Sequence, residues 1–373
     1  MTSMRGIRFS EFTGKNQSPF EKLLGVFKEL LLHTSGDVDE SIAWLRELDK
    51  EYHFTTAAYT IDDFIEDLKK KGFLREEIDN GDGDGDGGLT MTSKTEGAIR
   101  KSALEQVFGK LKKGQKGNHQ TNKSGQGDEE SSNLKPFQFG DSLNQIDMNQ
   151  SIKNAFANNG VDDLVLRHDD LVVKEEFHKS QLSTVLMIDI SHSMILYGED
   201  RITPAKRVAL ALAEFIKSKY PRDTLDIIVF GNDAWQIELE EVPYLKVGPY
   251  HTNTVAGLDL AMDLLRRKKN SNKQIFMITD GKPSCLHEPD GSYYKNSAGL
   301  DDLIVNKCYN RAAACRRANI PITTFMIAQD PYLQQFIQNF TQANKGKAFY
   351  TGLKGLGEFI FQDYENNRKR TIR

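Results

Sequence analysis

The second half of the sequence alternates short apolar runs with helical patterns, and this alternation limits the possible fold more than any other feature. Residues 182–190 read LSTVLMIDI. A continuous apolar run of this kind is typical of a central parallel strand that other elements cover on both faces. The alternation that follows predicts a doubly wound α/β domain with a mostly parallel sheet.

Each expected element can be placed by its pattern. Strands are expected at 170–179, 182–190, 224–230, 274–279 and 320–328, with a hairpin strand at 234–239 and a short edge strand at 347–350. Helices are expected at 204–220, 254–267, 300–319, 332–344 and 356–364. Thr203 is the expected N-cap of the first of these helices, and Pro204 its first residue. Together these elements predict one domain over residues 169–366.

Length and local composition divide the rest of the chain. Its 373 residues predict two or three domains. Apolar stripes at helical spacing predict a small helical N-terminal module over residues 1–78. Residues 79–135 are expected to be an acidic, low-complexity linker with a short helix at 97–112, followed by a partly helical connector at 136–168. Residues 114–133 have too few apolar side chains to fold and are expected to be disordered, and 367–373 form a basic tail.

Two motifs in the linker are incomplete. Residues 80–88, NGDGDGDGG, match the first half of a calcium-binding EF-hand loop, but Ser93 stands where the loop needs its bidentate Glu. An acidic flexible linker is therefore the favoured interpretation. Two near matches to a phosphate-binding P-loop, at 109–115 and at Lys123-Ser124, lack its Lys or its Gly. We therefore expect no P-loop.

Composition excludes several classes of protein. A net charge of −4 argues against a bulk nucleic-acid binder. Three cysteines without a C-x-x-C pair, Cys285, Cys308 and Cys315, fit a reduced compartment better than a disulfide scaffold. No stretch approaches the length of a membrane span, and the first residues lack an apolar signal core. We therefore expect a cytoplasmic protein.

Hydroxyl and carboxylate groups gather where the predicted strands end. Asp189, Ser191 and Ser193 follow the first core strand, Asp280 follows the strand at 274–279, and the loop at 250–254 (YHTNT) precedes a helix. Ligand sites of open α/β sheets lie beyond the C-terminal ends of the strands. Two carboxylates and three hydroxyls there are hard oxygen ligands, which suit Mg²⁺, Mn²⁺ or Ca²⁺.

With these residues the sequence resembles the von Willebrand factor A (VWA) domain family over roughly half of the chain. The resemblance implies a metal-ion-dependent adhesion site (MIDAS) and an open coordination position for a partner's carboxylate. The implied Mg²⁺ ligands are Asp189, Ser191, Ser193, Thr252 and Asp280. Thr252 is favoured over Thr254, which fits better as a helix N-cap. His192 and His251 flank the site and are expected to pack or form hydrogen bonds, because Mg²⁺ prefers oxygen.

The layout of the chain also resembles bacterial intracellular VWA proteins related to the magnesium-chelatase D subunit. That resemblance implies a partner among AAA+ ATPases of the MoxR or chelatase I type. The implied function is that of a metal-dependent, protein-binding adaptor without catalytic activity. The first half of the chain shows no AAA+-like module, so chelatase activity itself is not expected.

Two alternative functions remain open. One is a metal-dependent phosphatase or hydrolase with Asp189 as the nucleophile. Serines rather than further carboxylates surround Asp189, and Lys206 and Lys282 are the nearest cations by sequence. The other is an RNA-binding VWA protein, for which no aromatic residues interleave with the basic patches. These patches consist of Lys110, Lys112, Lys113 and Lys116, and of Arg266, Arg267, Lys268 and Lys269.

A long insert follows the Asp280 loop at the metal-site end of the predicted sheet. Residues 285–299 read CLHEPDGSYYKNSAG. Loops of this length at this place are often functional. We therefore expect Glu288, Tyr293 and Tyr294 to help define the partner surface.

Overall fold

The computed structural model divides into two compact units, residues 113–180 and the remainder of the chain. Calcium-loop residues 80–87, the stretch 109–129 with Lys110, Lys112, Lys113 and Lys116, and tail residues 369–373 lie outside the described part. The described residues are 18–76, 88–108, 130–138, 143, 146–160, 165–176, 181–198, 200–248, 250–270, 272–280, 282–296, 298–327, 330–350 and 356–368.

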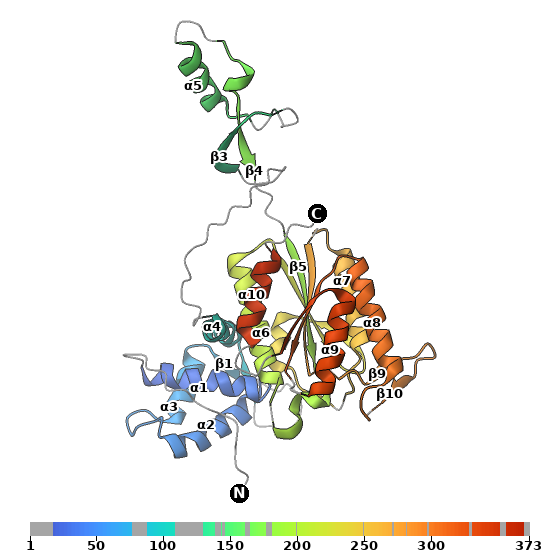
Figure 1. Ribbon diagram of the computed structural model, residues 1–373. Helices are drawn as coiled ribbons and strands as arrows, with labels where there is room; N and C mark the ends of the chain where they lie inside the picture. Colours follow the sequence, from blue (N-terminus) through green and yellow to red (C-terminus); the bar gives the residue numbers. More distant parts are fainter. Residues whose placement is uncertain are drawn as a thin grey trace. The chain divides into compact units, whose positions relative to one another are not determined.

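The larger unit is built on a six-stranded sheet, which confirms the predicted fold class (Figure 1). The strand order is β12-β11-β8-β5-β6-β7, and every pairing is parallel except that of β7 with β6. The strands are β5 (Leu182–Asp189), β6 (Thr224–Phe230), β7 (Ala234–Ile237), β8 (Asn272–Thr279), β11 (Ile322–Met326) and β12 (Lys347–Tyr350).

Helices cover both faces of this sheet. Helices α6 (Ile202–Lys219) and α10 (Leu356–Arg368) pack on one face; α7 (Thr254–Arg267), α8 (Asp302–Arg317) and α9 (Pro331–Asn344) pack on the other. Along β5, Leu186 and Ile188 join the α6 side, whereas Val185 and Met187 join the α7 side. Both faces of β5 are therefore dry, which explains the apolar run from Val185 to Ile188.

Two predicted N-caps are wrong, and the start of one of the two helices differs from the prediction by two residues. Helix α6 begins at Ile202 instead of after an N-cap at Thr203, and the backbone N–H of Thr203 donates to the Asp200 carboxylate at 3.0 Å. The N-cap of α7 is Asn253, whose side chain accepts from the N–H of Ala256, so Thr254 lies inside the helix. The N-cap of α6 is Arg201, which makes no capping bond through its side chain, and Asn caps α7 as well as Thr would, so residue type and spacing did not identify either cap.

The N-terminal module contains four helices and a small hairpin. These are α1 (Pro19–His33), α2 (Val38–Tyr52), α3 (Ile61–Lys70), β1 (Leu74–Glu76), β2 (Leu89–Met91) and α4 (Ser93–Phe108). Helix α4, which we assigned to the linker as a helix at 97–112, packs on α6, and the buried core of the module is continuous with that of α6. The module is therefore part of the larger unit.

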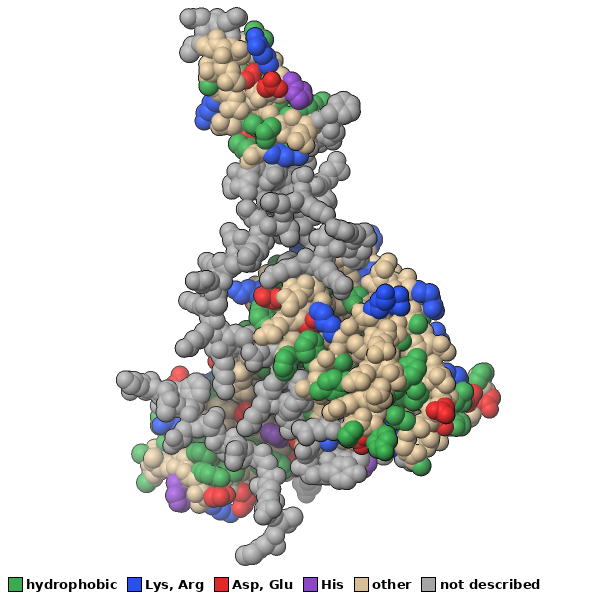
Figure 2. Space-filling model, viewed as in Figure 1, with side chains coloured by type: hydrophobic (Ala, Val, Ile, Leu, Met, Phe, Trp, Pro, Cys, Tyr) green, Lys and Arg blue, Asp and Glu red, His purple; other side chains and the backbone are tan. Residues whose placement is uncertain are grey.

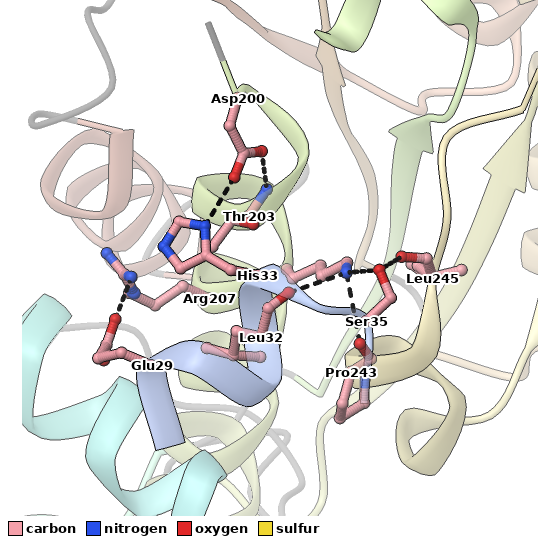
Figure 3. A network of polar contacts seen from close by, with 10 residues as sticks. Glu29, Leu32, His33, Ser35, Asp200, Thr203, Arg207, Pro243 and Leu245 are labelled. Carbon is pink, nitrogen blue, oxygen red and sulfur yellow. Dashed lines mark hydrogen bonds and ion pairs between the residues drawn. The ribbon is translucent and has the colours of Figure 1, made fainter. Parts of the chain in front are cut away.

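A buried lysine lies where the module meets the sheet domain (Figure 3). Lys206 on α6 is fully buried, and its ammonium group donates to Ser35 Oγ at 3.0 Å and to the carbonyls of Leu32 and Pro243 at 3.2 and 3.3 Å. Leu32 belongs to α1, and Pro243 to the 3-10 helix η4 (Leu239–Tyr244). One cation thus joins three segments that are far apart in sequence.

Ion pairs surround this lysine. His33 Nδ1 lies 3.0 Å from Asp200 Oδ2, and Arg207 of α6 pairs with Glu29 of α1 (Figure 3). Burial alone would raise the pKa of Asp200, but hydrogen bonds from His33 and Thr203 outweigh it and lower the pKa to about 2. Polar side chains of α1 therefore bond to α6 and to Asp200, just before it, across the contact between the module and the sheet domain.

In its described residues, the smaller unit has a two-stranded antiparallel sheet, an α-helix and a short 3-10 helix. Its elements are β3 (Glu130–Pro136), α5 (Met148–Asn159), the 3-10 helix η2 (His168–Asp170) and β4 (Val172–Glu176). We predicted a strand at 170–179 in the large sheet and disorder up to residue 133. Instead β4 pairs with β3, so this strand belongs to the smaller unit. A short apolar strand pattern does not reveal its partner.

Two further expectations concern compartment. No helix in the described ranges is long and apolar enough to cross a membrane. Cys285, Cys308 and Cys315 are free and buried. Burial raises the thiol pKa to about 11 at Cys285 and to about 12 at Cys308 and Cys315.

Lys206 should make the stability of the larger unit depend on alkaline pH. Burial lowers its pKa from 10.5 to about 8. Between these values the unfolded chain binds more protons at this site, so raising the pH favours the folded state. The free energy of unfolding of the wild type, relative to Lys206→Met, should rise by about 3 kcal/mol from pH 8 to pH 10.5. Urea denaturation at several pH values measures this difference in the free energy of unfolding. A difference that does not change with pH would contradict the burial of a titrating Lys206.

Candidate metal centre

The first loop of the site is held by the residues that end β5. The Asp189 carboxylate accepts the backbone N–H of Ser191 at 2.9 Å and the hydroxyl of Thr279 at 2.7 Å. Ser191 Oγ and Ser193 Oγ lie 3.0 Å apart. Asp189 is thus fixed by its own loop and by the neighbouring strand β8, and two hydroxyl groups lie beside each other.

Hydrogen bonds join the other two loops to the first. The N–H of Thr252 donates to Ser284 Oγ at 3.1 Å, and the N–H of Ser284 donates back to the carbonyl of Thr252 at 2.9 Å. The N–H of His192 donates to the carbonyl of Tyr250 at 3.1 Å. Hydrogen bonds therefore connect the three loops that carry the five predicted ligands, beyond the C-terminal ends of β5 and β8.

The centre concentrates negative charge away from water. Asp189 is completely buried and Asp280 is 3% exposed. Burial, and then the charge of Asp280, raise the pKa of Asp189 to about 7. Hydrogen bonds from Ser191 and Thr279 oppose this rise only in part. Two carboxylates in such a site are stabilised by a cation, and carboxylate and hydroxyl oxygens are ligands that suit Mg²⁺.

An ion here would depend on hydroxyl ligands. Among the residues that the structure describes, no group of three or more His, Cys, Asp and Glu side chains could hold a metal. Ser191 and Thr252 are 2% exposed, and Ser193 is half-buried. This set of two carboxylates and three hydroxyls fits a hard divalent ion.

The cation beside the site is one that sequence reasoning missed. Arg201 Nη1 lies 3.9 Å from Asp280 Oδ2, and both side chains are largely buried. Lys206, which we expected near the site, instead bonds to the N-terminal module, whereas the backbone N–H of Lys282 donates to Asp280 at 3.3 Å. No spacing in the sequence links Arg201 to Asp280.

The two histidines differ in their surroundings. His192 is exposed. Nδ1 of the His251 ring lies 3.5 Å from Ser284 Oγ. The backbone N–H of His251 donates to the side-chain oxygen of Asn232 at 2.8 Å. Burial, then the charges of Lys295 and Lys282, lower the pKa of His251. These contacts give His251 the structural role that we expected.

The insert after Asp280 folds into the antiparallel strands β9 (Cys285–His287) and β10 (Tyr293–Lys295). The Tyr293 hydroxyl donates to Asp233, and the Tyr294 hydroxyl donates to Asp301 at 2.9 Å. Hydrophobic and acidic side chains lie side by side at this hairpin (Figure 2). The role of Glu288, Tyr293 and Tyr294 in partner binding stays a prediction.

Asp189→Asn should stabilise the protein when divalent ions are removed with EDTA. The raised pKa of Asp189 means that the folded state loses stability as the pH rises from 4 through 7, and the amide does not carry this cost. At pH 8 we expect the free energy of unfolding of the variant to exceed that of the wild type by about 1–3 kcal/mol. The amide forms weaker hydrogen bonds than the carboxylate, which reduces this gain in stability.

Urea denaturation in EDTA at pH 5 and pH 8 measures this effect. Asp263→Asn on the exposed face of α7 is the matched control, and its difference from the wild type should not change with pH. The difference in stability between Asp189→Asn and the wild type should be larger at pH 8 than at pH 5. An equal or smaller difference at pH 8 would disprove the electrostatic account.

Two family models match parts of this chain. Residues 182–365 match the family described as "Rv0959-like protein, vWA domain", and residues 129–176 match "Rv0959-like protein, third domain". Similar proteins include uncharacterized protein Rv0959 of Mycobacterium tuberculosis (strain ATCC 25618 / H37Rv) and uncharacterized protein Mb0984 of Mycobacterium bovis. Each is 27% identical over 333 residues, which cover 84% of this chain and 46% of the relative. The chain thus spans about half the length of these relatives.

Solved structures of vWA domains are also similar. The vWF domain of the type V pili tip protein Mfa5 from Porphyromonas gingivalis is 11% identical, with a TM-score of 0.43, and the match covers 53% of this chain and 99% of that one. The SpRpn10 VWA domain is 17% identical, with a TM-score of 0.37, over 49% of this chain and 95% of that one. From the family match over residues 182–365 and the topology of the sheet, the C-terminal part of the chain is a vWA domain.

Proposed function

We propose that the vWA domain binds a protein partner through a divalent ion, Mg²⁺ or alternatively Mn²⁺ or Ca²⁺. Its ligands are Asp189, Ser191, Ser193, Thr252 and Asp280. The observation that carries the proposal is the pair of buried carboxylates beside clustered hydroxyls, on three loops that hydrogen bonds join. When bound, the ion supplies an open coordination position for a carboxylate of the partner.

The residues of the chain prepare this position. Thr279 and the Ser191 N–H hold both oxygens of Asp189, so the carboxylate is oriented in advance. Neutral hydroxyl ligands leave positive charge on an ion, which an incoming carboxylate can then satisfy. Arg201 adds a further positive charge beside Asp280.

The same contacts argue against a nucleophilic role for Asp189. A nucleophile must reach the phosphorus or carbonyl carbon that it attacks. Asp189 has no exposed surface, and each of its oxygens accepts a hydrogen bond. A binding function without turnover fits this burial better than a phosphatase or hydrolase.

We propose that the partner is an AAA+ ATPase of the MoxR or chelatase I type, or a client of that ATPase. We propose that the two proteins bind each other in the cytoplasm. The resemblance of the whole layout to chelatase D-related proteins supports the class of partner. Three free, buried cysteines support a reduced compartment. RNA is a weaker candidate, because Arg266 and Lys268 of the basic patch pair with Asp263 and Asp226.

Thr252→Val should weaken Mg²⁺ or Mn²⁺ binding at least tenfold, because it removes one oxygen ligand while keeping the shape of the side chain. Isothermal titration calorimetry measures the affinity. Thr254→Val is the matched control, since Thr254 lies two residues away inside α7 and is also buried. Equal affinities for the two variants would remove Thr252 from the ligand set.

A pull-down from native lysate tests the adaptor function. The full chain should recover its partner with Mg²⁺ and lose it with EDTA or with Asp189→Ala. Identification of the recovered protein as an AAA+ ATPase would support the partner class. A partner retained under EDTA and by the variant would place the contact away from the metal centre.

A further inference from the structure

An aromatic patch borders the metal centre. It consists of Trp235, Tyr250 and Tyr293, which are 41%, 37% and 37% exposed. The rings of Trp235 and Tyr250 meet edge to face with centroids 6.3 Å apart. Tyr293 of the β9–β10 hairpin donates its hydroxyl to Asp233, in the turn that leads to Trp235. Exposed rings are thus gathered from three separate segments.

The patch is continuous with the metal loops. Tyr250 lies two residues before Thr252, and its carbonyl accepts the N–H of His192, between Ser191 and Ser193. The β9–β10 hairpin begins beside Ser284, which bonds to Thr252. A ligand that reaches the metal centre therefore passes close to these rings.

The Tyr250 side chain packs closely against two glycines. A Cβ atom at Gly231 would lie 2.8 Å from the Tyr250 side chain, and one at Gly248 would lie 2.2 Å from its ring. Any side chain at these positions would displace the ring. A rigid, half-exposed aromatic ring loses little conformational entropy on binding, which is why such residues anchor protein interfaces.

Charged groups also lie here. The ammonium group of Lys295 lies over the Tyr293 ring, 5.3 Å from its centroid. Asp233 is occupied by the Tyr293 hydroxyl. An ammonium group and a carboxylate thus both lie against Tyr293, and the preference for an acidic ligand comes from the metal centre.

We infer that the aromatic patch is a second recognition site, which binds an aromatic or large aliphatic side chain next to the partner's metal-binding carboxylate. The inference rests on the proposed function and adds a sequence preference to it. The ligand class is an acidic segment of a partner protein that carries an apolar residue near its Asp or Glu. The metal centre supplies dependence on the ion, and the patch selects among acidic segments.

Selection from a phage-displayed library of random 12-residue peptides tests this inference. The full chain is immobilised in Mg²⁺, with EDTA elution. The expected peptides contain an Asp or Glu with an aromatic or large aliphatic residue within a few positions. When the Trp235→Ala variant is used for selection, the acidic residue should still be enriched in the peptides, whereas the apolar residue should not. Tyr52→Ala, at an exposed ring of the N-terminal module, is the control and should select as the wild type does.

Synthetic copies of the selected peptides give the magnitude. Trp235→Ala should weaken their binding about tenfold, and a copy with Gly in place of the apolar residue should bind wild type and variant equally. The inference would be overturned, and the proposed function left intact, by either of two results. The selected acidic peptides could lack any enrichment of apolar residues, or Trp235→Ala could select the same apolar residues as the wild type. Selection that needs neither Mg²⁺ nor Asp189 would overturn both.

Discussion

The buried ammonium group of Lys206 is the interaction on which the arrangement of the larger unit depends. It donates hydrogen bonds to α1, to the turn after α1 and to η4, so its position fixes three segments at once. A cation taken out of water is costly unless acceptors replace its hydration. Once these acceptors are in place, moving the N-terminal module away would leave the cation or its acceptors unpaired. The module is therefore held by a polar contact as well as by the apolar core that it shares with α6.

Two polar contacts of this module involve residues that lie close in sequence to the loops of the metal centre. His33 pairs with Asp200, the neighbour of Arg201, which in turn lies by Asp280. Ser35 donates to the carbonyl of Leu245, from which the chain runs to the loop of Thr252. The sheet positions the carboxylates, and the helical module supports the loops around them. The vWA domain and the N-terminal module thus form one structural body around the proposed binding site.

The sequence predicted most of the sheet domain, because its apolar runs and helical stripes are long enough to show their period. The strand at 224–230 and the helix at 254–267 have the expected bounds. The β1–β2 hairpin escaped notice because strands of three residues are too short for a pattern. Strand β4 was recognised as a strand but placed in the wrong sheet, since pairing is a property of the fold. The loops of the site followed from residue type at strand ends, whereas Arg201 could be found only in three dimensions.

The buried cysteines have a practical consequence for work on this protein. A thiol reacts with alkylating reagents as its thiolate, and the thiols of Cys285, Cys308 and Cys315 combine burial with raised pKa values. At neutral pH they form a slow-reacting background. A cysteine introduced on an exposed surface would react much faster, so a fluorescent or spin label can be attached at one chosen position without removing the native residues.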